Sequence, residues 1–517
     1  MRSILLTPVA LLLVLAPQVA SPQSAGPPSA GPPSASSPSG PPGEPLGLMQ
    51  ALQRAVAGNV DLRRDRVTIE VADANLTAAR GQFDFLITGA LTFSRTTQPP
   101  LTAQDIASGY NNDLGLDIGV SRQLETGGSL RLSLQNDAIN TNSRLSCGSP
   151  AGVATTCTFY NSQFDLTFNH PLLRGLGLEV TQANVRKQRI QKDLALLNRQ
   201  MRAANVLRDV ITAYWELAYA TQDLAIRRSA VDLAREQLRI TKAQIDVGRL
   251  APIDQAAVER AIGDRLQEVA LSEQSLYGRA LDLRRLLGVP ADPSEPLFSA
   301  VDAPTATARD VDVASEVRRA LDTNPQLRSL KMGLQLNAID IQTASNTVRP
   351  RLDFVGTIGS RGRNATFPET LAQTGGLDDL TWSAGLNFQA PVENRAANGQ
   401  YRAAQLAAEL ARLDAGTLEL TIRDTVMRVS TQIRTSSTRV ELAKQTVGFA
   451  QQNLEAERAR FSVGRSTNND VLLRQQELKN AEISVVRANV DLLNSDVALS
   501  AITAEILDRY GVVLKGL

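Results

Sequence analysis

Two stretches of the chain carry an apolar residue at every seventh position, a spacing typical of long packed helices. The first row is Val210, Leu217, Leu224, Val231, Leu238 and Ile245, and the second is Val426, Ile433, Val440, Val447, Leu454 and Phe461. Each member of the second row lies 216 residues after its partner in the first. The same offset carries Val247-Gly248-Arg249 onto Val463-Gly464-Arg465, and Asp254 onto Asp470. Two features that share one offset predict an internal duplication.

Each repeat is predicted to contain one very long helix. Residues 177–247 and 396–463 contain no proline, and Gly248 and Gly464 follow them. At 1.5 Å per residue, the second helix would be about 100 Å long. Shorter helices are expected on either side, stacked end to end beside the long ones. A solid antiparallel coiled coil is the alternative that the heptads leave open.

Between the helices, the apolar period changes from seven to two. Apolar residues alternate with polar or small ones over Phe85 to Phe93, Leu114 to Val120, Leu130 to Leu134, Phe164 to Phe168, Phe354 to Ile358 and Trp382 to Phe388. Strands with one apolar and one polar face are what a water-filled transmembrane barrel requires, although a soluble half-buried sheet gives the same alternation. More than half of all aromatic residues fall within 83–172 or 352–392. That concentration favours the barrel.

Loop lengths indicate which ends of the strands face outward. A tight turn at residues 125–128 is expected on the periplasmic side, and longer loops are expected outside. One of these outer loops carries Cys147 and Cys157. In an oxidising compartment the pair would close a small disulfide; two free thiols are the alternative.

The first residues indicate export. Arg2 precedes an apolar run from Ile4 to Ala16, with small residues after it, as in a secretory signal peptide. The tandem AGPPS sequence that follows predicts a flexible tether. The predicted organisation is a signal peptide at 1–22, a linker at 23–46, a first repeat at 47–310 and a second at 311–517. The first repeat holds helices at 47–80, strands at 84–172, the long helix 177–247, a helix at 251–288 and a linker at 289–310. The second holds helices at 311–349, strands at 352–391, the long helix 396–463 and a helix at 467–509.

The composition argues against several classes of function. Lys+Arg (54) and Asp+Glu (53) nearly cancel, so no global field would hold nucleic acid. His170 is the single histidine, and no GxxxxGK[ST] phosphate-binding motif occurs. We therefore expect no enzyme activity, no cofactor and no metal site, and we interpret His170 as structural.

Several segments resemble the TolC-type outer-membrane efflux proteins, over about residues 46–510. They are FSVGRSTNNDVLLRQQELKNAE with its weaker copy IDVGRLAPIDQAAVERAI, and NPQLRSL, SNTVRPRLDF, NHPLLRGLG and NFQAPVENRAANGQYRAAQL. The resemblance implies a mainly α homotrimer. Its strands would form an outer-membrane β-barrel in contact with lipid, and its helices a long periplasmic α-helical barrel. It also implies a Gram-negative cell, a periplasmic adaptor and an inner-membrane pump.

The resemblance implies a passive exit duct of a tripartite efflux or type I secretion system, for small molecules or proteins. The turns Val247-Gly248-Arg249 and Val463-Gly464-Arg465 would be the periplasmic tip at which the adaptor docks. Asp254 and Asp470 either form a cation-attracting gate there or cap helices after the turns, and one residue can do both. Where a second acidic residue can follow Asp470, this chain has Leu473.

The first repeat departs from the family in having four strand candidates where two are usual. The additional hairpin either widens the barrel or extends beyond the membrane, and we favour the second. A different class of function, an exported coiled-coil stalk or adhesin with a small membrane anchor, is the alternative to the channel. Duplicated tips argue against it, because a stalk has no need of them.

Overall fold

The computed structural model describes residues 43–98, 109–142, 147, 155–290, 292, 294–307, 310–377 and 379–512. The predicted signal peptide and most of the predicted linker 23–46 lie outside the described residues. The end of that linker is not a linker: β1 (Glu44–Leu46) pairs in parallel with β6 (Phe298–Ala300), inside the predicted linker 289–310. Leu46 is fully buried, and this burial explains why so short a segment is held in place.

The helical part consists of matching elements from the two halves of the chain. The first half supplies α1 (Leu48–Gly58), α2 (Val60–Arg80), α4 (Leu178–Thr181), α5 (Ala183–Asp246) and α6 (Ile253–Leu286). The second supplies α7 (Val313–Thr323), α8 (Pro325–Val348), α10 (Arg395–Ser462), α11 (Asn468–Ile502) and α12 (Ile506–Arg509). Asn59 and Asn324 cap α2 and α8 in the same way, each accepting hydrogen bonds from two backbone N–H groups of the first turn.

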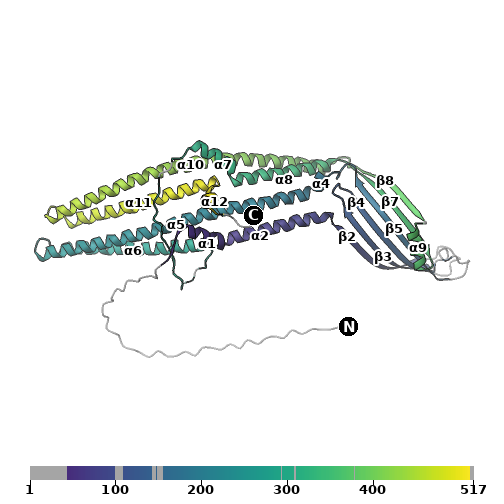
Figure 1. Ribbon diagram of the computed structural model, residues 1–517, viewed down its shortest axis with the longest axis horizontal. Helices are drawn as coiled ribbons and strands as arrows, with labels where there is room; N and C mark the ends of the chain where they lie inside the picture. Colours follow the sequence, from purple (N-terminus) through teal and green to yellow (C-terminus); the bar gives the residue numbers. More distant parts are fainter. Residues whose placement is uncertain are drawn as a thin grey trace, which may run out of the picture. The chain divides into compact units, whose positions relative to one another are not determined.

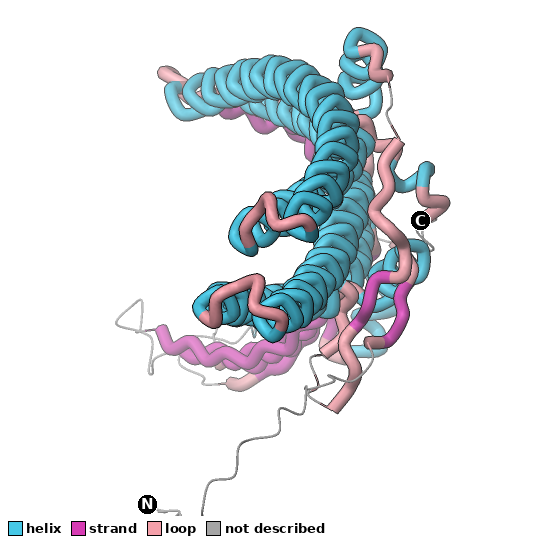
Figure 2. Tube along the Cα trace, turned by 90° about the vertical axis from the view of Figure 1, so that its left-hand side faces the viewer, coloured by secondary structure: helices cyan, strands magenta, loops and turns pink. Residues whose placement is uncertain are grey.

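The helices lie side by side in a curved row (Figures 1 and 2). α5 contacts α6, α2 and α11, whereas α10 contacts α11 and α8. The heptad rows face these contacts, since Val210, Leu217, Val426 and Ile433 are all at most 1% exposed. The α5–α11 and α5–α8 contacts join the two halves, so α10 ends the row on one side and α6 and α2 end it on the other.

Six strands form one antiparallel sheet beyond the ends of the helices (Figure 1). They are β2 (Phe85–Gln98), β3 (Gly109–Gln123), β4 (Ser129–Thr141), β5 (Cys157–Pro171), β7 (Arg351–Asn364) and β8 (Leu380–Gln389), paired in that order. A short 3-10 turn, η1 (Gly81–Phe83), leads from α2 into β2, and α9 (Phe367–Gly376) lies between β7 and β8.

The additional hairpin of the first repeat belongs to this sheet. One row of the register crosses all six strands through Ile87, Val120, Leu132, Leu166, Ile358 and Trp382. The apolar residues of β3 and β4 therefore continue those of their neighbours. Cross-strand pairing and apolar alternation hold all four strands of the first repeat in one surface, so the hairpin does not extend away from its neighbours in the sheet. This arrangement favours the wider barrel over the extension that we expected.

Candidate functional site: the two sheet faces and the helical tips

The two faces of the sheet differ in chemistry. One face carries solvent-exposed apolar side chains: Ile87 is 74% exposed, Leu91 72%, Phe93 73%, Leu386 64% and Trp382 76%. Water-exposed apolar surface of this extent is unfavourable, and in proteins it marks a surface that contacts a partner or lipid. We call this face the apolar belt.

The opposite face is polar and charged. Asp113, Asp117 and Asp137 lie on β3 and β4, and Arg361 and Arg363 lie on β7. Gln135 donates a hydrogen bond to Asp117 over 2.8 Å. Gly115 leaves room for two neighbouring polar side chains, since a Cβ there would lie 2.7 Å from Thr92 Oγ1 and 2.9 Å from Asp137 Oδ1.

A cavity of about 450 Å³ follows the same polar surface; its lining includes Thr88, Thr92, Asp117, Gln135 and Asp137. A polar face of this kind can line a channel that holds water and dissolved ions. The apolar belt on the other side of the sheet cannot.

The sheet and the helix row both end in open edges. β2 and β8 each pair with one neighbour only, within the described residues. On the same side as β8, α10 carries an exposed apolar row at heptad spacing: Leu406 is 49% exposed, Leu413 60%, Leu420 62% and Met427 47%. On the same side as β2, α2 exposes Val60, Val67 and Val71. Two exposed apolar helix faces therefore border the two free strand edges.

At the other end of the helices, the two predicted tips have the same geometry. Gly248 and Gly464 end the long helices with φ of 75° and 76°, a left-handed conformation that favours glycine. Val247 and Val463 are both 69% exposed. The predicted docking residues Arg249 and Arg465 follow directly and close the turns through their backbone N–H groups, bonded to Gln244 and Arg460.

Asp254 and Asp470 both accept hydrogen bonds from a residue just before their own helix. Asp254 accepts a hydrogen bond from the Ala251 N–H over 3.2 Å. Asp470 accepts from the Thr467 N–H over 3.1 Å and from its hydroxyl over 2.7 Å, and its own N–H donates back to that hydroxyl. These hydrogen bonds, the one from the Thr467 hydroxyl above all, hold the pKa of Asp470 below its ordinary value. Asp470 is thus the ionised third helical residue of a capping box, in which Thr467 is the N-cap.

A buried polar contact beside the second tip was not predicted from the sequence. Asn468 Oδ1 accepts hydrogen bonds from Gln237 Nε2 and Thr241 Oγ1, each over 2.8 Å. All three side chains are at most 4% exposed. They bind the first turn of α11 to α5, and so hold the tip of one repeat against the long helix of the other.

A second unpredicted network lies further along the same helices. Arg265 of α6 is 5% exposed and donates to Ala230 O of α5 over 2.7 Å and to Gln475 of α11 over 2.9 Å. Buried Lys479 of α11 donates to Glu268 of α6. Charged residues within a long helix normally face water, so no pattern in the sequence distinguishes these from their exposed neighbours.

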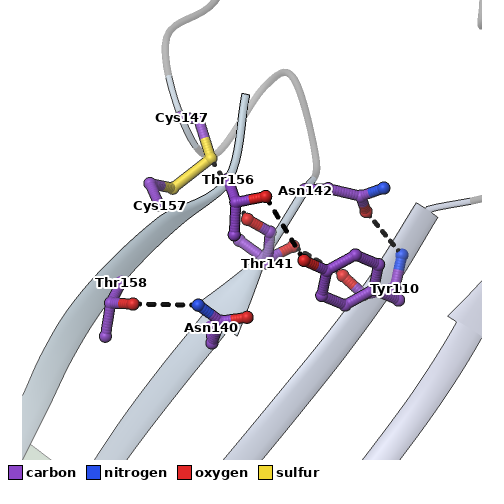
Figure 3. Close-up of a disulfide and its surroundings, with 8 residues drawn as sticks. All are labelled: Tyr110, Asn140, Thr141, Asn142, Cys147, Thr156, Cys157 and Thr158. Carbon is purple, nitrogen blue, oxygen red and sulfur yellow. Dashed lines mark hydrogen bonds between the residues drawn. A yellow bond between two sulfur atoms is a disulfide. The ribbon is translucent and has the colours of Figure 1, made fainter. Parts of the chain in front are cut away.

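The outer end of the sheet carries a disulfide between Cys147 and Cys157, whose Cα atoms are 5.6 Å apart. Figure 3 shows the polar contacts around it. Tyr110 N donates to Asn142 Oδ1 over 2.7 Å, and Asn140 Nδ2 donates to Thr158 Oγ1 over 2.9 Å. The bond ties the loop after β4 to the first residue of β5.

His170 lies at the opposite, helix-facing end of β5. Its ring stacks on that of Phe168, with the ring centroids 5.6 Å apart. His170 therefore packs within the sheet, as a structural residue would.

Comparison with known proteins identifies the family. The sequence profile of the outer membrane efflux proteins matches residues 161–289 and 317–505, more than half of the chain. The chain belongs to the outer membrane efflux protein family. It is accordingly a protein of the outer membrane, and this membership favours the channel over the stalk. Among the described residues, no helix combines the length and the apolar character needed to cross a membrane.

Two members of known name match this chain at low sequence identity. The chain is 20% identical over 310 residues to the outer membrane efflux protein BepC of Brucella suis, and 22% identical over 317 residues to nodulation protein T of Rhizobium leguminosarum. Each match covers 60% of this chain, and 65% or 66% of the relative.

The fold is shared more widely. The CmeC outer membrane channel of Campylobacter jejuni superposes with a TM-score of 0.62 at 14% identity, over 89% of this chain and 85% of that one.

Proposed function

We propose that this protein is the outer-membrane exit duct of a tripartite efflux or type I secretion system. It would be a passive conduit for small molecules or proteins, powered by an inner-membrane pump and joined to it by a periplasmic adaptor. The observation that carries the proposal is the sheet, in which one register places an exposed apolar belt on one face and polar and charged residues on the other. A sheet of this kind fits the wall of a barrel that has lipid on its outside and water on its inside.

Closure of the duct requires several copies of the chain, and the proposal is a homotrimer. The even number of strands allows such a ring to close, because β2 and β8 then run in opposite directions and the edge of one copy can pair antiparallel with that of the next. The exposed apolar row on α10 would pack against α2 of the neighbouring copy in the same ring. Three six-stranded sheets make a barrel of eighteen strands, in the range of about 16–18 strands that leaves an aqueous channel.

The periplasmic tips would dock the adaptor and close the duct. Exposed Val247 and Val463, with Arg249 and Arg465 beside them, supply an apolar contact ringed by positive charge. In a trimer, Asp254 and Asp470 would repeat around the axis and attract cations while they also cap their helices.

Ion conductance across a planar bilayer tests whether the protein is a channel. It also tests whether Asp254 and Asp470 act as a gate or only cap their helices. Discrete conductance steps are expected from the purified protein. Replacing both Asp254 and Asp470 by Ala is expected to enlarge the steps. Thr467→Ala is the matched control, because it removes the cap hydroxyl and leaves the carboxylate in place. Larger steps in both variants would assign Asp470 to the cap alone, and an absence of steps from folded protein would refute the channel.

A further inference from the structure

The short helix α9 lies on the apolar side of the sheet. Gly362 shares a face with Ile358, because residues an even number of positions apart along a strand point the same way. A Cβ on Gly362 would lie 2.4 Å from Thr370 O and 2.5 Å from Thr374 Oγ1. The helix therefore rests directly on that face, near the end of the strands furthest from the long helices (Figure 1).

Beneath α9, the apolar belt is interrupted. Ser162 of β5 pairs with Gly362, and Ser360 of β7 pairs with Phe164, so both serines point to the belt side. They are nonetheless only 1% and 0% exposed. Polar side chains that face lipid are unfavourable, and α9 is the element that shields these two.

The helix itself has two different sides. Thr370 and Thr374, one turn apart, face the sheet and are at most 2% exposed. Thr374 Oγ1 donates to Ser162 O over 3.2 Å. The outer side carries Phe367 and Leu371, also one turn apart, which are 43% and 41% exposed. The helix thus replaces the interrupted part of the belt with an apolar surface of its own.

Side-chain bonds at the end of β7 fix this position. Gln373 Oε1 accepts from the Arg363 N–H over 3.1 Å, and Gln373 Nε2 donates to Asp379 over 2.9 Å. The ring of Tyr160 meets that of Phe367 edge-on, with the ring centroids 6.0 Å apart. These contacts join the last strand of the first repeat to the first strand of the second, across the surface that α9 covers.

We propose that α9 is an interfacial helix on the outside of the barrel, embedded by Phe367 and Leu371 among the acyl chains of the outer leaflet. The inference rests on the proposed function, since it takes the apolar belt as the lipid-facing surface. Its amphipathic pattern, with threonines inward and apolar residues outward, fits a helix that lies in the plane of a membrane interface. It acts as a membrane-facing cover over the junction of the two repeats.

Lipid quenching of a site-specific fluorophore tests the proposal. Bimane is attached to Leu371→Cys in the full chain, whose own cysteines are paired in the disulfide. The protein is reconstituted in vesicles that contain brominated phosphatidylcholine. Ile358→Cys on the belt is the lipid-facing reference, and Thr357→Cys on the opposite face is the water-facing reference. Bimane at Leu371 is expected to lose as much fluorescence as at Ile358, and bimane at Thr357 is expected to keep its fluorescence.

The outcomes separate the two proposals. Quenching at Ile358 without quenching at Leu371 would overturn the interfacial helix and leave the barrel intact. If Ile358 itself escapes quenching, the proposed function fails as well. Gly362→Ala adds a second readout, because the new methyl group displaces α9. The quenching of bimane at Leu371 should then change, while bimane at Ile358 is quenched as before; unchanged quenching at Leu371 would contradict the placement of the helix.

Discussion

At the scale of single residues, the Asp470 cap has a definite pH dependence. The hydrogen bonds from Thr467 lower the pKa of Asp470 in the folded state. A lowered pKa stabilises the fold above the ordinary value, near 4, and this stabilisation is lost as the pH falls through the folded-state pKa. Asp470→Asn should therefore speed hydrogen exchange at the start of α11 at neutral pH, with no difference left in strong acid. Asp414→Asn, an exposed site within α10, is the control. A difference that persists in strong acid would contradict the cap.

Asn468 provides a second prediction at this scale. Asn468→Ala leaves the buried Gln237 amide without its acceptor, which costs about 1–3 kcal/mol, whereas the Thr241 hydroxyl keeps its bond to Gln237 O. The tip of the second repeat should then separate more readily from α5, and its turn should be cut faster by a protease at Arg465. Neighbouring Asn469 is exposed, so Asn469→Ala should leave the cleavage rate unchanged. Equal rates in both variants would show that the contact does not hold the tip.

At the scale of helices, Arg265 links three elements. It joins α6 to Ala230 O of α5 and to Gln475 of α11. Arg265→Ala leaves the buried Gln475 amide oxygen without this donor, whereas Ala230 O keeps its bond within α5, so the free energy of unfolding should fall by about 1–3 kcal/mol. Arg260→Ala on the exposed side of α6 should change it by no more than about 0.5 kcal/mol. Thermal unfolding in detergent measures the stability of both variants. An Arg265→Ala variant as stable as the unchanged protein would show that apolar packing alone holds these helices together.

The same scale shows what the sequence can predict. Long helices and alternating strands have strong periods, and the predicted helix 396–463 corresponds to α10 at Arg395–Ser462. Very short elements, and pairings between segments far apart in the chain, leave no such period in the sequence. β1 and β6 pair over three residues each although they lie some 250 positions apart, and α9 is too short to show a helical period. Asn468 looks in the sequence like its exposed neighbour Asn469, because only the fold buries one of them.

At the scale of the whole molecule, the exposed apolar row on α10 predicts how copies assemble. Leu413 and Leu420 point away from the buried positions of α10 and are 60% and 62% exposed, so nothing in the described part of the chain covers them fully. In the proposed ring, α2 of the next copy covers them. Replacing both by Glu puts charge into that contact and should convert the oligomer to monomers, as measured by native mass spectrometry in detergent.

The matched control for assembly is Thr421→Glu, which adds a charge to an exposed side of the same helix off the apolar row. It should leave the trimer intact. Circular dichroism separates loss of assembly from loss of folding, because isolated copies keep the heptad contacts of α10 with α11 and α8. A trimer that survives both glutamates would place the copy-to-copy contact elsewhere, and the strand edges β2 and β8 would then have to hold the ring without α10.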